Sequence, residues 1–325
     1  MTVFELLAQL SDKKYISGRQ LSQTLGCTPN ALSDAVRELN AQGLQVFAIP
    51  GRGYKLAAPF CKLSTDAITQ QLGALSAHFE VEVVDEITST NTALLAAANN
   101  RGGYKKIQLL VAESQTQGRG RRGRSWQASL GGSLTFSLRW QFDKPAGQLG
   151  GASLAVGLAL VEALIEAGMV HAKLKWPNDI LVGKNKCAGI LIETQGDVFE
   201  PACLVIGIGV NYRLPPLFEN TIDQAVTDYC ANVRNAMPRD ALISGICRHL
   251  YNRLSAFNAH GFVPLKAAWL SHHAYANAQV SATFGDGRSI NGEVVDIADD
   301  GALVLQAGSK REVLYSGEVS LRAAK

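Results

Sequence analysis

The fold of this 325-residue chain is restricted first of all by a glycine- and arginine-rich segment, residues 118–126 (GRGRRGRSW). The segment matches the GxGxxG dinucleotide-binding pattern, which needs a helix directly after its glycines because the helix N-terminus holds the pyrophosphate. Here the glycines lead instead to a Gly131-Gly132 turn and to residues 133–140, in which apolar and polar side chains alternate. Such alternation predicts a strand with one buried face, so the sequence argues against a dinucleotide-binding domain.

The same segment predicts a flexible, strongly cationic loop, because it holds four arginines and three glycines within seven residues. Glycine lets a backbone approach a ligand closely, and the arginine fork suits phosphate oxygens. We therefore expect a loop that closes over a triphosphate or an acyl-adenylate and holds its charge. Two alternatives stay open: a solvated basic loop, and a patch that binds nucleic acid directly.

Residues 1–62 are predicted to form a winged helix-turn-helix domain that ends in a short linker at 57–62. Gly26 ends one helix, and Thr28 and Pro29, a capping hydroxyl and a first-turn proline, begin the next. A hairpin follows, with Arg52 at its tip and Lys55 close behind. Two short helices joined by a tight turn are typical of DNA-binding domains, although a domain used for packing or protein contacts has the same pattern.

The rest of the chain is predicted to be α+β, with a central mixed-sheet domain at 63–276 and a smaller domain at 277–325. The central strands and helices are expected, in chain order, at 109–112, 152–167, 190–192, 204–210 and 242–257. The last 49 residues hold short strands between glycine-containing turns. That pattern predicts a small β-barrel of the SH3-like kind.

Bulk features indicate a cytoplasmic protein without a membrane partner. The N-terminus lacks a basic start and a long apolar core, so it is no signal peptide. The most apolar stretch, 150–170, contains two glutamates and is predicted to be a buried helix. Six cysteines without a CxxC pair predict buried, reduced thiols. Six histidines without ligand spacing predict no metal site, with His272 and His273 at a solvated helix end.

Two further segments of the central domain carry chemically useful groups. In residues 173–180, alternation predicts a short strand that Pro177 ends, which leaves Asn178 and Asp179 just past the strand end. Lys186 comes just before a strand of small residues. An ammonium there can stabilise a carboxylate that attacks phosphorus, and later the departing phosphate. Taken alone, a Pro-Asn-Asp turn and a surface lysine are both common structural features.

Together these segments resemble the bacterial biotin–protein ligases, in particular the bifunctional type that is also the repressor of the biotin operon. The matching motifs follow the family's order along nearly the whole chain, the winged helix included. They are Ser89-Thr90-Asn91, Gln115, GRGRRGRSW (118–126), KWPND (175–179), KCAGIL (186–191), GIGVN (207–211) and GEVSLR (317–322).

The resemblance implies a role for each matching residue. Those implied to hydrogen-bond the biotin ureido ring and neighbouring atoms are Ser89, Thr90, Asn91 and Gln115. Those implied to fold over biotin and the adenylate are Arg119, Gly120 and Arg121. The implied nucleotide side consists of Arg119, Arg121, Trp126, Lys175, Asn178 and Asn211. Lys186 is implied to contact the biotin carboxylate and the phosphate, with Asp179 orienting Lys186 or helping with Mg²⁺. The implied catalytic set is Lys186, Arg119, Arg121 and Asp179.

The implied reaction has two steps, with biotin as substrate and ATP with Mg²⁺ as co-substrate and its ion. The biotin carboxylate attacks the α-phosphorus of ATP to give biotinyl-5′-adenylate, and a lysine of the biotin carboxyl carrier protein of acetyl-CoA carboxylase then displaces AMP. A homodimer formed through the central sheet and binding to operator DNA are also implied. Two other activities stay open: a lipoate or octanoate ligase or transferase on the same fold, and a ligand-sensing repressor without turnover.

The sequence departs from the family pattern in two places. Residues 220–230 lack the tryptophan that stacks on adenine in repressor-type members, and Ala225 and Val226 near that place predict aliphatic cover instead. The recognition helix has Arg37 as its only cation. Residues 1–62 nevertheless carry seven Lys or Arg against four acids, an excess equal to the net charge of +3 of the whole chain. The expected DNA contacts are Arg19, Thr28, Asn30, Ser33, Arg37, Arg52 and Lys55.

Overall fold

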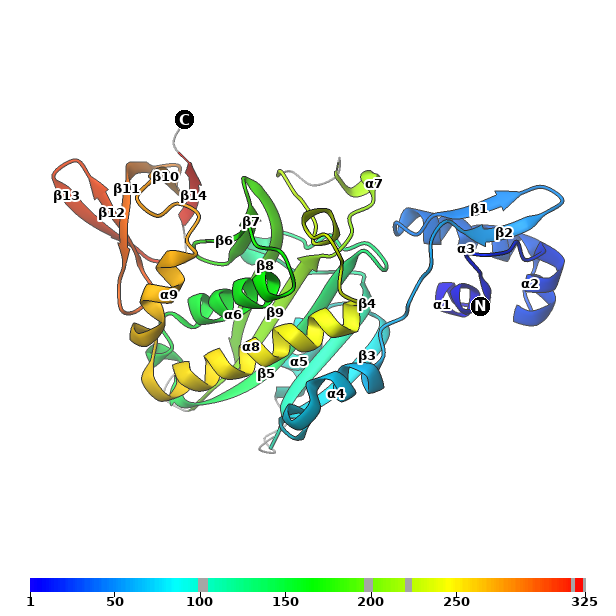
Figure 1. Ribbon diagram of the computed structural model, residues 1–325, viewed down its shortest axis with the longest axis horizontal. Helices are drawn as coiled ribbons and strands as arrows, with labels where there is room; N and C mark the ends of the chain where they lie inside the picture. Colours follow the sequence, from blue (N-terminus) through cyan, green and yellow to red (C-terminus); the bar gives the residue numbers. More distant parts are fainter. Residues whose placement is uncertain (99–104, 196–200, 220–223, 317–318, 324–325) are drawn as a thin grey trace.

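The computed structural model describes residues 1–98, 105–195, 201–219, 224–316 and 319–323, which form three lobes in a row (Figure 1). The N-terminal helices and hairpin lie at one end and the C-terminal strands at the other, with a seven-stranded sheet between them. None of the helices in these ranges is both long enough and apolar enough to cross a membrane. The helix predicted within 150–170 is α6 (Ala152–Glu166), and most of its residues are buried, as expected.

The N-terminal lobe is a winged helix-turn-helix, as predicted. Its elements are α1 (Val3–Gln9), α2 (Gly18–Leu25), α3 (Pro29–Ala41), β1 (Val46–Ile49) and β2 (Gly53–Leu56). Gly26 ends α2 in the left-handed conformation, with φ of 60°, and the Thr28 hydroxyl caps α3 by accepting the Ala31 amide. Next to the turn of the wing, Gly53 has φ of +105°, and a Cβ there would lie 2.1 Å from the Ile16 carbonyl oxygen. Only glycine fits that position.

The central lobe is built on a mixed sheet of seven strands. In spatial order they are β3 (Phe79–Ile87), β4 (Ile107–Gln115), β5 (Ser133–Pro145), β9 (Pro201–Asn211), β8 (Asn185–Gln195), β7 (Asp179–Val182) and β6 (Ala172–Lys175). Among the described strand pairs of this sheet, β3 and β4 alone are parallel, and the other neighbours are antiparallel. The three predicted central strands lie in β4, β8 and β9, all inside the sheet. The prediction of a mixed sheet in an α+β chain is therefore confirmed.

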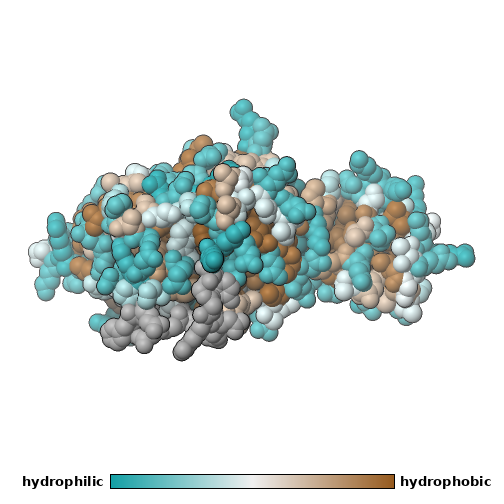
Figure 2. All heavy atoms as spheres, turned by 90° about the horizontal axis from the view of Figure 1, so that it is seen from below, coloured by the Kyte–Doolittle hydropathy of each residue, from teal (hydrophilic) through white to brown (hydrophobic). Residues whose placement is uncertain are grey.

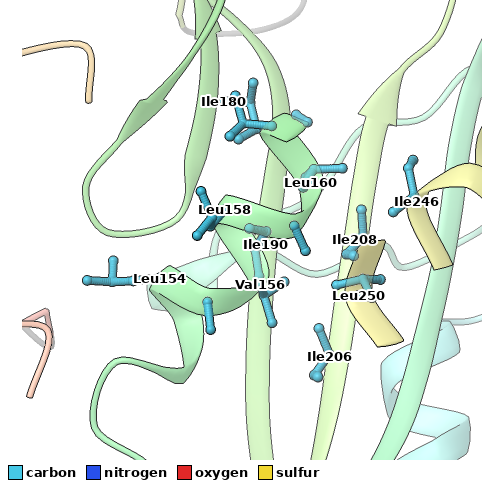
Figure 3. Packing of buried hydrophobic residues seen from close by; sticks show 14 of the residues in the cluster. Leu154, Val156, Leu158, Leu160, Ile180, Ile190, Ile206, Ile208, Ile246 and Leu250 are labelled. Atoms are coloured by element: carbon cyan, nitrogen blue, oxygen red, sulfur yellow. The ribbon is translucent and has the colours of Figure 1, made fainter. Parts of the chain in front are cut away.

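Two long helices, α6 and α8 (Arg239–His260), cover one face of this sheet (Figure 1). Figure 3 shows Leu158 of α6 and Leu250 of α8 packed toward the sheet, where Ile208 lies. Burying each such side chain contributes roughly 1.5–3 kcal/mol. The short helix α5 (Thr90–Ala98) lies on the opposite face, in a separate small cluster. The other α-helices described after the linker are α4 (Thr65–Leu72), α7 (Pro216–Glu219) and α9 (Lys266–Ser271).

Strand β5 corrects one prediction. We expected residues 133–140 to have a single buried face, but Ser137 and Leu138, which point to opposite faces, are both 0% exposed. The reason is that β5 lies between β4 and β9, with α8 on its apolar face and α5 on its polar face. Its hydroxyl groups are therefore inside the protein, where they need hydrogen-bond partners.

The C-terminal lobe is a small all-β domain, as predicted. Its strands pair in the order β13 (Lys310–Leu314), β12 (Leu303–Ala307), β11 (Ser289–Ile297), β10 (Gln279–Phe284) and β14 (Val319–Ala323). Each strand is antiparallel to its neighbour. An ion pair joins this lobe to the central one, with Lys266 Nζ 2.8 Å from Asp296 Oδ2. Residues 317 and 318 of the matching GEVSLR motif lie outside the described residues.

Two side-chain predictions are wrong. The six cysteines are free, as expected, but only Cys187 and Cys247 are buried, and Cys61 is exposed because it lies between lobes. His273 is 4% exposed rather than solvated. The segment that follows α9 packs along β6, where the Leu174 amide donates to the His272 carbonyl at 2.8 Å, and this pairing carries His273 into the interior.

The first two lobes meet at a small junction. Residues 57–62 form no helix or strand. Glu113 and Arg239 form a buried ion pair, 2.7 Å from Oε2 to Nη1, and Arg239 also donates to the Cys61 carbonyl. Leu130 of the central lobe is buried in the core of the N-terminal lobe. The face seen in Figure 2 is mainly hydrophilic, with hydrophobic residues near the place where the two lobes meet.

Candidate functional site

Three glycines make a shallow floor on the sheet face opposite α6 and α8. Along β9, Ile206 and Ile208 point into the core, so Gly207 and Gly209 lie on the other face. Gly189 of β8 pairs directly with Gly209. Because these three positions have no side chains, a ligand or a loop can approach the sheet closely there.

Side chains from two distant segments lie on this floor. A Cβ at Gly207 would lie 2.3 Å from Asn91 Oδ1, and one at Gly209 would lie 2.3 Å from Trp126 Cε2. Asn91 comes from the first turn of α5, and Trp126 from the end of the arginine-rich loop. The glycines thus bring together two segments that the sequence assigns to one site.

A network of neutral polar groups surrounds the start of α5. The parallel strands β3 and β4 end side by side, so the Thr90 amide donates to Gln115 Oε1 at 2.8 Å. Ser137 Oγ of β5 lies 2.6 Å from Thr90 Oγ1 and 2.6 Å from Asn91 Oδ1. Ser89, Thr90 and Asn91 are at most 3% exposed. All four residues expected to contact the ureido ring therefore lie in one cluster.

Lys186 reaches the same face because β8 is irregular. The register between β7 and β8 skips Cys187, which is therefore the extra residue of a β-bulge. Cys187 and Ala188 both point into the core, and Lys186 turns toward Gly189. Lys186 Nζ lies 2.8 Å from Asp179 Oδ1, and only 16% of its side chain is exposed. A carboxylate whose side chain is only 14% exposed thus holds this cation in place.

The arginine-rich loop lies folded over the cluster. Arg119 Nη2 lies 2.7 Å from Glu193 Oε1, and Arg121 Nη1 donates to Asn178 Oδ1 at 3.0 Å. Arg121 also donates to the Ser316 carbonyl of the C-terminal lobe. The loop is therefore held by β8, by the turn between β6 and β7, and by the C-terminal lobe. No α-helix begins at its glycines, as predicted, and the next strand is β5.

Two cavities lie on either side of Trp126. The smaller, of about 60 Å³, is bordered by the neutral cluster, Gly120, Arg121 and Lys186. The larger, of about 810 Å³, is bordered by Lys175, Asn178, Asn211, Ala225, Val226 and Arg322. Small-molecule pockets usually have about 300–1,000 Å³. The larger cavity therefore has the volume of a typical ligand site, whereas the smaller one is well below that range.

Cations are crowded beside the larger cavity. Burial lowers the pKa of Lys175, and the charges of Lys186 and Arg322 lower it further. Burial and the neighbouring Arg122 likewise lower the pKa of Arg121. Cations that are held together against desolvation and mutual repulsion favour an anionic ligand such as a polyphosphate.

The Asn211 side chain makes hydrogen bonds within the protein, in addition to bordering the larger cavity. Its amide donates to the carbonyls of Lys186, at 3.3 Å, and Thr227, at 3.1 Å, and so ties the segment after residue 223 to β8. Ala225 and Val226 consequently border the larger cavity, at the place expected for aliphatic cover of adenine. Residues 220–223 lie outside the described residues.

Two residues of the site, Ser137 and Glu193, do not stand out in the sequence. Ser137 belongs to the polar face of an alternating strand, which normally faces solvent. Glu193 follows an apolar run, like many carboxylates near strand ends. A possible signal for Ser137 is its register, since it lies directly opposite Gly207, but register is not readable from one sequence.

The expected DNA contacts all lie on the N-terminal lobe, and they differ in how freely they can move. Exposed members are Arg19, Thr28, Asn30, Ser33, Arg37 and Arg52, and Lys55 is half-buried. The Thr28 hydroxyl is used in capping α3, and Ser33 Oγ donates to the Pro29 carbonyl at 3.0 Å. Arg37 pairs with Asp34 on its own helix. The wing and α2 therefore offer the freer cations.

Family models match each of the three lobes. The Biotin/lipoate A/B protein ligase family matches residues 83–211, the Biotin protein ligase C terminal domain matches 277–322, and an HTH domain matches 2–55. The matches follow the order of the lobes along the chain.

Characterised relatives resemble the chain over its length. Bifunctional ligase/repressor BirA of Escherichia coli strain K12 is 33% identical over 322 residues, which cover 99% of this chain and 97% of the relative. The biotin–[acetyl-CoA-carboxylase] ligase of Mycobacterium tuberculosis is 32% identical over 255 residues, 77% of this chain and 92% of the relative. Among solved structures, a biotin protein ligase from Aquifex aeolicus in complex with biotin and ATP has a TM-score of 0.64 and 27% identity, covering 75% of this chain and 99% of the other.

Proposed function

The chain belongs to the biotin protein ligase family, in the branch of bifunctional ligase/repressors, and from this premise we propose that it joins biotin to a lysine of an acceptor protein with ATP and represses transcription in response to biotin. One observation carries the ligase activity. Lys186, held by Asp179, borders both a cavity of neutral hydrogen-bonding groups and a cavity lined by cations. A cation at that junction suits a carboxylate from one side and a phosphate from the other.

The smaller cavity fits biotin by its chemistry. The ureido ring is polar but uncharged, which matches Thr90, Asn91 and Gln115, and the valeryl chain suits an apolar wall such as Leu191. Because this cavity is small, at about 60 Å³, we infer that Trp126 and the arginine-rich loop move aside when biotin enters and then close over it.

The larger cavity is our proposed site for ATP. Lys175, Arg121 and Arg322 border it and suit the phosphates, and Ala225 and Val226 suit the adenine ring. Mg²⁺ would accompany ATP, since this ion is usually held by phosphate oxygens and water with one or two carboxylates, and it would neutralise phosphate charge. Asp179 lies within 4.0 Å of both Lys186 and Lys175, which favours its role in orienting those cations.

In the first step, a biotin carboxylate oxygen forms a bond to the α-phosphorus while the bond from that phosphorus to pyrophosphate breaks. Lys186 Nζ is placed to reduce the repulsion between the two anions as they meet and to stabilise the charge on the phosphoryl oxygens. Arg121 lies on the same path, between Asn178 and the C-terminal lobe. The protein contributes to this step mainly by positioning the two substrates and by placing positive charge beside the phosphoryl oxygens.

In the second step, the acceptor lysine amine attacks the carbonyl carbon of the mixed anhydride, the bond to the AMP oxygen breaks, and an amide forms. A closed arginine-rich loop keeps water from the anhydride until the acceptor arrives. The acceptor that we propose is the biotin carboxyl carrier protein, in line with the printed name of the mycobacterial relative.

We also propose two further partners. Operator DNA would bind the N-terminal lobe through Arg19 and Arg52, with α3 in the major groove. A second copy of the chain would pair through the central sheet, whose edge strand β3 has one side without a neighbouring strand among the described residues.

Mass spectrometry of a biotin carboxyl carrier domain tests the ligase activity. The domain is incubated with the protein, MgATP and either biotin, lipoate or octanoate. A biotin-sized mass gain that requires ATP is the expected result. A mass gain with lipoate or octanoate only would mean that the substrate is that acid and not biotin. No gain with any acid would favour a ligand-sensing repressor without turnover. A gel shift with and without biotin then tests repression.

A further inference from the structure

Glu193 contacts two parts of the site, the start of α5 and the arginine-rich loop. It lies on β8, opposite Val205, and its side chain is 20% exposed. Its Oε2 accepts a hydrogen bond from Asn91 Nδ2 at 2.9 Å, and its Oε1 lies 2.7 Å from Arg119 Nη2. One carboxylate thus joins a buried residue of α5 to the first arginine of the loop.

The first contact fixes the orientation of the Asn91 amide. Its Nδ2 donates both to Glu193 and to the Leu191 carbonyl, at 3.3 Å. Its Oδ1 accepts from Ser137 Oγ and has a second lone pair left. A carboxylate can only accept, so Glu193 forces Asn91 to present its oxygen to the cavity. An acceptor at that point suits a ligand N–H such as those of a ureido ring.

The second contact fixes the loop. Arg119 Nη2 reaches Glu193, and Nη1 donates to Thr92 Oγ1 at 3.4 Å. Among the described contacts, this ion pair is the shortest one that joins Arg119 to the sheet. If it is lost, the described contacts leave Arg119 only its neutral one to Thr92, and the loop is held by Arg121 and by Trp126.

We propose that Glu193 is a positioning residue that couples the two events: it orients Asn91 toward the ureido N–H and latches the arginine-rich loop through Arg119, so that the loop stays closed over the adenylate. The proposal rests on the proposed ligase function for its substrate. The latch itself exists in the ligand-free protein and is testable without any substrate.

Limited trypsin digestion of the ligand-free chain tests the latch alone. The loop holds four cleavage sites within six residues, at Arg119, Arg121, Arg122 and Arg124, and the last two are exposed. Glu193→Gln removes the charge and nearly preserves the shape, and Glu38→Gln, an exposed site on α3, is the matched control. We expect Glu193→Gln to be cut in the loop about 10-fold faster than wild type, and Glu38→Gln to be cut at the wild-type rate. Equal rates in all three proteins would overturn the latch.

Enzyme assays test the coupling. With Glu193→Gln we expect the KM for biotin to rise about 10- to 100-fold, since a charge-assisted hydrogen bond is lost. The single-turnover rate of adenylate formation at saturating biotin should stay within about 3-fold, because Lys186 and Asp179 are untouched. Dissociation of preformed adenylate should accelerate, so more pyrophosphate is released per biotin transferred. Glu193→Asp, which keeps the charge, should restore part of the biotin affinity.

A double-mutant cycle separates positioning from general damage. Glu193→Gln is combined with Asn91→Ala and, separately, with Arg119→Ala, and biotin affinity and adenylate release are measured. Non-additive effects are expected in both pairs. Additive effects in both pairs would overturn the proposal. It would also be overturned if Glu193→Gln raised the KM for biotin and lowered the single-turnover rate by the same factor, together with a lowered Tm. If wild type makes no adenylate but the loop cleavage differs as expected, the ligase function fails while the latch stands.

Discussion

The ligand site of the central lobe and the DNA-facing surface of the N-terminal lobe hold their polar side chains in opposite ways. In the central site, Lys186 and Asp179 are 16% and 14% exposed and lie against each other. On the recognition helix, Arg37 and Asp34 are 78% and 64% exposed. The first arrangement is pre-formed for a small ligand, which lowers the cost of binding. The second leaves long side chains free to adjust to a large, charged partner.

The largest effect that sharpens this contrast is expected at Lys186. Lys186→Ala should lower the single-turnover rate of adenylate formation by roughly 10²–10³-fold, since removing one preorganised group that stabilises charge at the reacting atoms typically slows a reaction by that factor. Lys310→Ala, an exposed site in the C-terminal lobe, is the control. Circular dichroism should show that both variants are folded. Near-normal adenylate synthesis by folded Lys186→Ala would mean that this cation is a structural one.

The glycine floor supplies the next largest effect. Gly207→Ala would place a Cβ 2.3 Å from Asn91 Oδ1, so Asn91 must leave its position between Ser137 and Glu193. We expect biotin affinity, measured by calorimetry, to fall about 100-fold, as when a buried hydrogen-bonded network is broken. Gly147→Ala meets nothing within 4 Å and is the control. Unchanged affinity in Gly207→Ala would show that Asn91 does not contact biotin.

These two regions also differ in how far the sequence predicts them. The winged helix follows from local signals, since Gly26 ends one helix and Thr28 caps the next. The central strands follow from apolar runs. The contacts between side chains of the ligand site are harder to predict, because the partners come from strands that are distant in sequence. Ser137 meets Asn91 only through the pairing of β5 with β9, which no periodicity reveals.

Lys186 shows that a local motif can identify a residue of the site without giving the direction of its side chain. The motif KCAGIL suggests the residue, but its direction depends on the bulge at Cys187, which is visible only in the register between β7 and β8. His273 shows a failure: a pair of histidines after a helix suggests solvent, yet a single backbone pairing with β6 buries it. Local sequence thus predicts elements, whereas burial of single side chains depends on tertiary pairing.

That buried histidine predicts a pH effect confined to the central lobe. Burial lowers the pKa of His273 to about 4, below the ordinary value of about 6.5 in an unfolded chain. As the pH falls below about 6.5, the unfolded chain takes up this proton before the folded one, so the free energy of unfolding declines until about pH 4. Between pH 7 and pH 5 the loss should be roughly 2 kcal/mol.

Urea unfolding followed by tryptophan fluorescence measures this loss, because all four tryptophans lie between residues 126 and 269. His273→Leu should remove about 2 kcal/mol of the pH dependence, whereas His260→Leu, at an exposed site, should keep it. The N-terminal lobe contains no histidine, so its protection from amide exchange should change less over the same range. An unchanged pH dependence in His273→Leu would show that another group is responsible.

The smallest effects are expected on the DNA-facing surface, where single charges act independently. Arg52→Ala should weaken binding to a mixed-sequence DNA duplex several-fold and lower the salt slope by about 0.9, the value of one phosphate contact. Arg37→Ala should change both quantities less, because Asp34 already neutralises that guanidinium. Asp34→Asn should strengthen binding, since it removes a negative charge and frees Arg37. Fluorescence anisotropy over a salt series measures all three. A larger loss in Arg37→Ala than in Arg52→Ala would mean that DNA breaks the Arg37–Asp34 pair, and the recognition helix rather than the wing would then supply the main phosphate contact.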